Sequence, residues 1–186
     1  MFLAYHFNKF SDAQKIAAKG RKIVKDVSGL LLYSQFHYYE SLILLANIPE
    51  YGQKEYSNAR KRILLNQKKM RIWANDCPEN FANKFFLIEA ELERLKGNIT
   101  LASQNYDKSI KLSQKESNTV DQALGNELAG LFWLENSKPE FAKIYLVKAH
   151  KLYNIWGARA KASSILVKHN NLIVTNENLG TKSMNS

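Results

Sequence analysis

The chain of 186 residues is poor in the residues that interrupt helices, and it has a single cysteine. Three prolines and eight glycines are spread along it, and no segment keeps the alternation of apolar and polar residues that marks a half-buried strand. Cys77 alone cannot form an internal disulfide, and so low a cysteine content is typical of a reducing compartment. These scarcities predict an almost wholly helical chain.

Acidic residues are also scarce relative to basic ones. The sequence has 27 Lys and Arg against 17 Asp and Glu, which gives a formal net charge of +10. A surplus of this size admits an acidic protein or nucleic acid as partner. It is concentrated between Lys54 and Arg71, where seven basic residues accompany one acid, Glu55.

Long apolar runs and secretion signals are missing as well. The most apolar segment, Leu30 to Ile48, contains Gln35, His37 and Glu40, which are too polar for a membrane span. Met1 to Phe7 is apolar but lacks the basic start and the small-residue cleavage site of a signal peptide. We therefore expect a cytoplasmic protein without a membrane span.

No motif of a known catalytic or cofactor site stands out. The chain has no phosphate-binding Gly-x-x-x-x-Gly-Lys loop, no Gly-x-Gly-x-x-Gly after a strand, and no serine elbow. No histidine is marked as a base for Cys77, for which a structural role is the simpler interpretation. The four histidines lack the spacing of a zinc-binding helix: His6, His37, His150 and His169. We expect no enzymatic activity, no metal and no cofactor.

One helical pattern occurs four times along the chain. Counting i, i+4, i+7 and i+11 follows one face of an α-helix, and the first and third places are mostly small, so a partner helix can approach closely. The four sets are Ala13/Ala17/Gly20/Val24, Ala59/Ile63/Asn66/Met70, Ala102/Tyr106/Ser109/Ser113 and Ala142/Leu146/Ala149/Tyr153. Their starting alanines are spaced widely enough to leave room for one helical hairpin each.

This pattern predicts an all-α fold, a tetratricopeptide-like right-handed superhelix of antiparallel helical hairpins with about four repeats, the first truncated. We expect one helical domain at 1–168 and a disordered tail at 169–186. Within the domain, the hairpins are expected at about 1–27, 30–75, 80–115 and 118–156, and a final helix at 158–168. Gly97 and Gly157 are expected to end helices. The residues expected to cap helix starts with their side chains are Ser11, Asn98, Asn118 and Ser137.

The N-terminal end begins with apolar residues where a repeat array needs a polar cap. Phe2, Leu3, Tyr5 and Phe7 stand close together. We expect this end to be covered by sequence upstream, by a partner or by a second copy of the chain through self-association. The alternative is that Met1 to Phe7 folds back as its own cap.

The basic segment is the main binding candidate. On a helical wheel Arg60, Lys61, Lys68 and Arg71 fall outside the core stripe, which consists of Tyr56, Ala59, Ile63, Asn66, Met70 and Trp73. A solvated outer face is the simplest interpretation, and a grip on an acidic partner is the functional one. Nucleic acid ranks lower, because phosphate binding calls for charge that continues across neighbouring repeats.

Several segments resemble the helical repeat region of very large bacterial multi-domain signalling proteins. They are Trp73 to Phe81 (WANDCPENF), Asn126 to Trp133 (NELAGLFW), Ala142 to Leu146 (AKIYL) and Trp156 to Lys161 (WGARAK). The resemblance covers about residues 30–168 and is strongest from Trp73 onward. In that family a serine/threonine kinase domain and an AAA-type ATPase precede the repeats, and a GAF sensor and often a histidine kinase follow.

The resemblance implies a module without chemistry of its own. The catalytic motifs of the family lie in its other domains, so no catalytic residue carries over. The leading hypothesis is a non-enzymatic scaffold or regulatory module, a fragment of a signal-transduction ATPase/kinase, which contacts protein or neighbouring domains. The alternative is a free-standing adaptor that binds acidic peptides or proteins through the basic helix, and nucleic-acid binding ranks below both.

Overall fold

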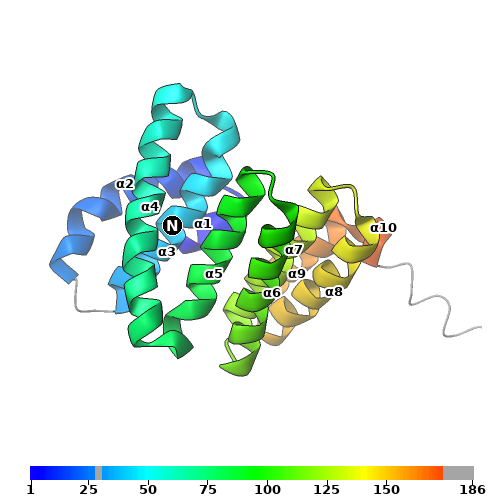
Figure 1. Ribbon diagram of the computed structural model, residues 1–186. Helices are drawn as coiled ribbons and strands as arrows, with labels where there is room; N and C mark the ends of the chain where they lie inside the picture. The colour runs from blue at the N-terminus through cyan, green and yellow to red at the C-terminus, as the bar shows by residue number, and fades with distance from the viewer. Residues whose placement is uncertain (28–30, 174–186) are drawn as a thin grey trace, which may run out of the picture. The chain divides into compact units, whose positions relative to one another are not determined.

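The computed structural model describes residues 1–27 and 31–173, and helices are the only regular secondary structure in these ranges. Residue 30, where a hairpin was expected to begin, and most of the expected tail lie outside them. The α-helices are α1 (Phe2–His6), α2 (Phe10–Ile23), α3 (Leu31–Asn47), α4 (Gln53–Asp76), α5 (Pro78–Leu95), α6 (Ile99–Lys115), α7 (Thr119–Glu135), α8 (Pro139–Ile155), α9 (Arg159–Lys168) and α10 (Asn170–Ile173) (Figure 1). Two 3-10 helices, η1 (Val24–Val27) and η2 (Ile48–Glu50), flank α3.

The chain forms two compact units that divide within α6, between Asn105 and Tyr106. In the first unit each helix from α1 to α5 packs against the next, and α3 also contacts α1 and α5. In the second unit α8 contacts α7, which precedes it, and α9, which follows it. Helix α10 contacts both α8 and α9. Consecutive packing of this kind is expected when short connections join amphipathic helices.

The four sets of the helical pattern lie almost entirely in the interior. Fifteen of the sixteen residues are buried, including Ala102, Ala142 and Ala149 with no measurable exposure. The exception is Gly20, which is partly exposed. A Cβ there would lie 2.9 Å from a ring carbon of Phe36, so glycine lets the aromatic ring sit against α2.

The ends of the four successive helices α5 to α8 share one turn, which also follows α1 at Asn8. Gly97, Ser117, Ser137 and Gly157 have φ values of 73°, 53°, 56° and 88°, and the three intervals between them are equal in length. In each turn the amide of the next residue donates to a carbonyl five residues back, at 2.8 to 2.9 Å, as for Asn98 and Glu93. This is the Schellman arrangement, which satisfies carbonyls at a helix end. The residue after each turn is also the N-cap of the next helix.

This turn explains which capping predictions hold. Asn98 and Asn118 cap as expected, since their side-chain oxygens accept from the amides of Leu101 and Asp121. The prediction for Ser137 is wrong, because Ser137 occupies the left-handed position of the turn and the N-cap of α8 is Lys138. The prediction for Ser11 is also wrong, because α2 already begins at Phe10.

The C-terminal end of the described chain is more ordered than the sequence indicated, whereas the N-terminal end is helical as expected. The tail was expected to be disordered from residue 169, yet α10 forms at Asn170–Ile173, and Leu172 and Ile173 pack against the core of the second unit. At the other end α1 packs on α2 and α3. It buries Tyr5 while Leu3 and Phe7 remain exposed.

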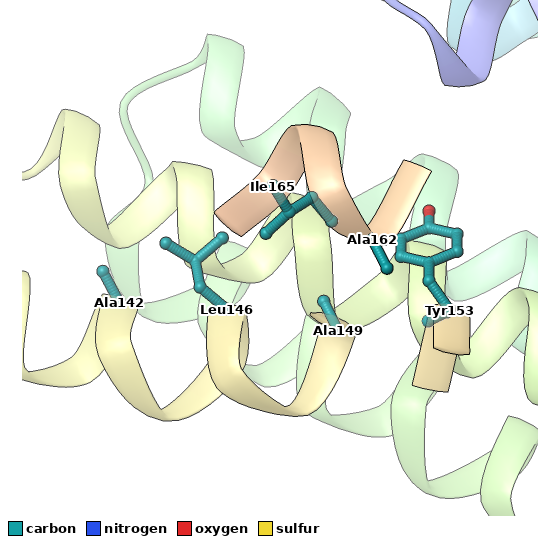
Figure 2. Close-up of a cluster of buried hydrophobic side chains, with 7 residues drawn as sticks. Ala142, Leu146, Ala149, Tyr153, Ala162 and Ile165 are labelled. Carbon is teal, nitrogen blue, oxygen red and sulfur yellow. The ribbon is translucent and has the colours of Figure 1, made fainter. Parts of the chain in front are cut away.

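The core of the second unit shows why small residues recur. Ala142, Leu146, Ala149 and Tyr153 lie along one side of α8 and face Ala162 and Ile165 of α9 (Figure 2). On α7, a Cβ added at Gly130 would lie 2.7 Å from Cγ of Leu146. Glycine is therefore what lets α7 approach α8 this closely.

Replacing Gly130 by alanine should destabilise the second unit by about 1–3 kcal/mol, because the added methyl group overlaps Leu146. The loss should be smaller in a Leu146→Ala background, where the overlap is gone. Urea unfolding followed by circular dichroism measures all four proteins of this double-mutant cycle. Equal costs of Gly130→Ala in both backgrounds would contradict the close approach.

Candidate anion-binding groove

Two adjoining cavities in the first unit form the candidate site. The Tyr51 cavity has a volume of about 510 Å³ and is lined by Gln14, Arg21, Leu44, Tyr51, Glu55, Asn58, Ala59, Lys61, Arg62 and Leu65. The His37 cavity has a volume of about 310 Å³ and is lined by Arg21, Val24, Tyr33, His37, Arg62, Leu65, Asn66, Lys68 and Lys69. Because they share Arg21, Arg62 and Leu65, they form one continuous surface, which we call the basic groove.

Helices α2, α3 and α4 build this groove. Twelve residues of α3 are buried, so α3 lies inside the unit in contact with α2 and α4. The period of α4 places Ala59, Ile63 and Asn66 in the interior. Its residues Lys61, Arg62, Lys68 and Lys69 then project beside α2 and line the cavities.

The groove carries an excess of positive charge. Arg21, Lys61, Arg62, Lys68 and Lys69 line it, and Glu55 is the acid in the lining. In the described ranges no carboxylate pairs with a groove lysine or with Arg62; the ion pair of the groove joins Arg21 to Glu40. Unpaired cations along a concave surface attract an anionic ligand.

Glu40 lies beneath the groove, and both of its carboxylate oxygens accept hydrogen bonds. Its carboxylate is buried and accepts a hydrogen bond from Nε of Arg21 at 2.5 Å and one from Nδ2 of Asn66 at 2.9 Å. The amide of Asn66 also reaches Oγ of Ser41 at 3.2 Å. Arg21 compensates the charge of Glu40, so the cations of α4 keep their own charge uncompensated.

His37 is held in its neutral form by two neighbours. The Asn66 amide donates to Glu40, so its Oδ1 accepts and Nδ1 of His37 carries the proton at 2.9 Å. Nε2 then has a free lone pair, which accepts from the ammonium of Lys69 at 3.1 Å. The same ammonium donates to the Tyr33 hydroxyl at 2.7 Å. Lys69 is thereby fixed at the cavity wall without an acidic partner.

Burial lowers the pKa of His37, and the positive charge of Lys69 lowers it further. The hydrogen bond to Asn66 and the carboxylate of Glu40 act in the opposite direction. The net lowering agrees with the neutral tautomer that the hydrogen bonds define. His37 is therefore a neutral hydrogen-bond acceptor inside a positively charged cavity.

Two of the four basic residues singled out in the sequence line the groove, and the other two lie outside it. All four are exposed, but Lys61 and Lys68 line the cavities whereas Arg60 and Arg71 do not. The guanidinium of Arg71 instead lies 5.5 Å from the centre of the Phe85 ring. Arg21, Arg62 and Lys69 also line the groove, although the sequence pattern did not single them out.

Other candidate residues lie apart from the groove. Among the described residues no three His, Cys, Asp or Glu side chains are grouped so that they could hold a metal. Cys77 donates its thiol proton to Glu79 at 2.9 Å, and this bond raises the pKa of the thiol. A raised pKa makes Cys77 a poorer nucleophile. No helix in the part of the chain that is described is long and apolar enough to cross a bilayer.

Comparisons with known proteins give one distant similarity. Over 116 residues the chain is 26% identical to hybrid signal transduction histidine kinase G of Dictyostelium discoideum. The similarity covers 62% of this chain but 3% of that protein. This relative is not bacterial, whereas the sequence motifs resemble those of bacterial proteins. No family model matches the chain, and no solved structure matches it.

Proposed function

We propose that this chain is a non-enzymatic helical-repeat module, of tetratricopeptide-like type, that binds an acidic segment of a protein or of a neighbouring domain in the basic groove. The observation that carries the proposal is the row of unpaired cations along the two cavities. Asp- or Glu-rich segments offer the complementary charge, and an extended segment fits a groove that runs over two connected cavities.

Two further observations support the repeat type and the setting. Turns that recur at equal intervals are typical of arrays built from equal helices, and α6, α7 and α8 have 17 residues each. The distant similarity to a signalling histidine kinase supports a role inside or beside a signalling protein. A module of this kind contributes contacts and leaves the chemistry to other domains.

A fluorescent peptide of ten residues rich in glutamate tests the groove. We expect binding that weakens steeply as salt rises, because exposed charges at the groove are screened. The variant Lys61→Gln/Arg62→Gln/Lys68→Gln should bind at least about tenfold more weakly, since each lost charge removes part of a charge-assisted contact. Fluorescence anisotropy at two salt concentrations measures both effects.

The matched control removes three charges from the same helix outside the cavities. Lys54→Gln/Arg60→Gln/Arg71→Gln has the same net charge as the groove variant, and all three side chains are exposed. It should bind the peptide almost as the unchanged protein does. If both triple variants weaken binding equally, the affinity depends on net charge and not on the groove. Tighter binding of a single-stranded oligonucleotide than of the peptide would replace the proposal by a nucleic-acid function.

A further inference from the structure

The His37 cavity differs from the rest of the groove in its chemistry. Its lining holds four cations, Arg21, Arg62, Lys68 and Lys69, and no acidic residue. The neighbouring Tyr51 cavity has Glu55 in its lining. At about 310 Å³ the His37 cavity is at the lower end of the range for ligand pockets, which is enough room for one side chain of a bound segment.

We propose that the His37 cavity binds the phosphoryl group of a phosphorylated residue, presented by the acidic segment that lies in the Tyr51 cavity. This inference rests on the proposed function and names the modification that the segment carries. The two cavities share Arg21 and Arg62, so a segment in one can place a side chain in the other. A phosphate monoester has nearly two charges and three acceptor oxygens, which a carboxylate lacks.

Two cationic residues of the lining have donor capacity left for such a group. Two protons of the Lys69 ammonium are used by Tyr33 and His37, and in the described ranges its third has no acceptor. The guanidinium of Arg62 has no carboxylate partner in the same ranges and lines both cavities. A planar guanidinium and an ammonium on one wall can bind different oxygens of one phosphoryl group.

His37 couples this binding to proton uptake. The phosphoryl oxygens compete for the Lys69 proton that His37 accepts as well as for the unused third proton. When the ammonium gives both to the phosphoryl group, Nε2 of His37 loses its donor and becomes free to accept a proton. The resulting imidazolium would share the cavity with Tyr33 and the buried Glu40 of α3, with Arg62, Asn66, Lys68 and Lys69 of α4, and with Arg21 of α2. Without a ligand the cations oppose that charge, whereas a bound dianion offsets them.

The experiment compares two peptides of ten residues rich in glutamate, one with a central phosphoserine and one with serine. We expect the phosphorylated peptide to bind at least about tenfold more tightly, as one or two additional charge-assisted contacts would give. Lys69→Gln should remove this difference, so that the two peptides bind the variant with equal affinity. Lys111→Gln, an exposed position in the second unit, should preserve the difference.

A second measurement uses the unchanged protein and does not depend on any variant folding. Nuclear magnetic resonance of the His37 ring nitrogens should show its pKa rising when the phosphorylated peptide is added, and not when the serine peptide is added. Equal affinity for the two peptides, or an unmoved His37 pKa, would overturn the phosphoryl inference while binding of the serine peptide keeps the proposed function. If neither peptide binds, the proposed function itself is overturned. Binding of inorganic phosphate as tight as that of the peptide would overturn the role of the segment.

Discussion

Replacing Lys161 by methionine should destabilise the second unit by about 3–5 kcal/mol, because it leaves a buried carboxylate without its counter-charge. The ammonium of Lys161 donates to Oε1 of Glu127 at 2.6 Å, and the hydroxyl of Tyr153 donates to Oε2 at 2.8 Å. Lys161 is 4% exposed and Glu127 is 6% exposed. Water therefore cannot solvate the carboxylate of Glu127 when the ammonium of Lys161 is removed. Urea unfolding followed by circular dichroism gives the loss.

Two companion variants isolate this effect. Lys148→Met removes an exposed lysine from α8 and should change the free energy of unfolding by no more than about 0.5 kcal/mol. Glu127→Gln combined with Lys161→Met should recover much of the stability, because the amide is neutral and can still accept from Tyr153. A loss no larger than that of Lys148→Met would contradict the buried pair.

The second large effect is expected at Arg21. Arg21→Met leaves Glu40, which is 1% exposed, with Asn66 as its remaining donor among the described residues. We expect a loss of about 3 kcal/mol, the lower end of the range for a broken buried pair, because the side chain of Arg21 is 31% exposed. Thermal or urea unfolding of the variant measures it.

Lys22→Met is the matched control, since Lys22 is the next residue of the same helix and is exposed. Its cost should stay within about 0.5 kcal/mol. Adding Glu40→Gln to Arg21→Met should restore part of the stability, because it removes the buried negative charge that Arg21 no longer compensates. If Arg21→Met is as mild as Lys22→Met, the pair beneath the groove contributes no stability.

The helical period was enough to predict the interior faces of α2, α4, α6 and α8, because burial follows one side of a regular helix. It was not enough at the start of α4. Tyr56 was placed in the core stripe but is exposed. Helix α4 has 24 residues, whereas its neighbour α3 has 17. Because α4 is longer, α3 cannot cover the whole apolar stripe of α4.

The sequence predicts the part of the groove whose residues are close together in the chain. Charge density along the sequence identified α4, because its cations are close together in the chain. Arg21 is separated from Glu40 by 19 positions and from α4 by a whole helix, and only packing brings them together. Asn66 was expected in the interior, but periodicity does not tell that it links His37 to Glu40.

The equal spacing of the turns has a consequence for how such a chain can change in length. Ser117 and Gly157 occupy the same backbone state, at the ends of α6 and α8. Deleting or duplicating the whole segment from one of these turns to the other would therefore join helix ends that already fit, with each helix keeping its direction. Removing or adding a single helix with its turn would reverse the direction of every later helix. Gene rearrangements should accordingly be tolerated in steps of one hairpin, with no new loop required.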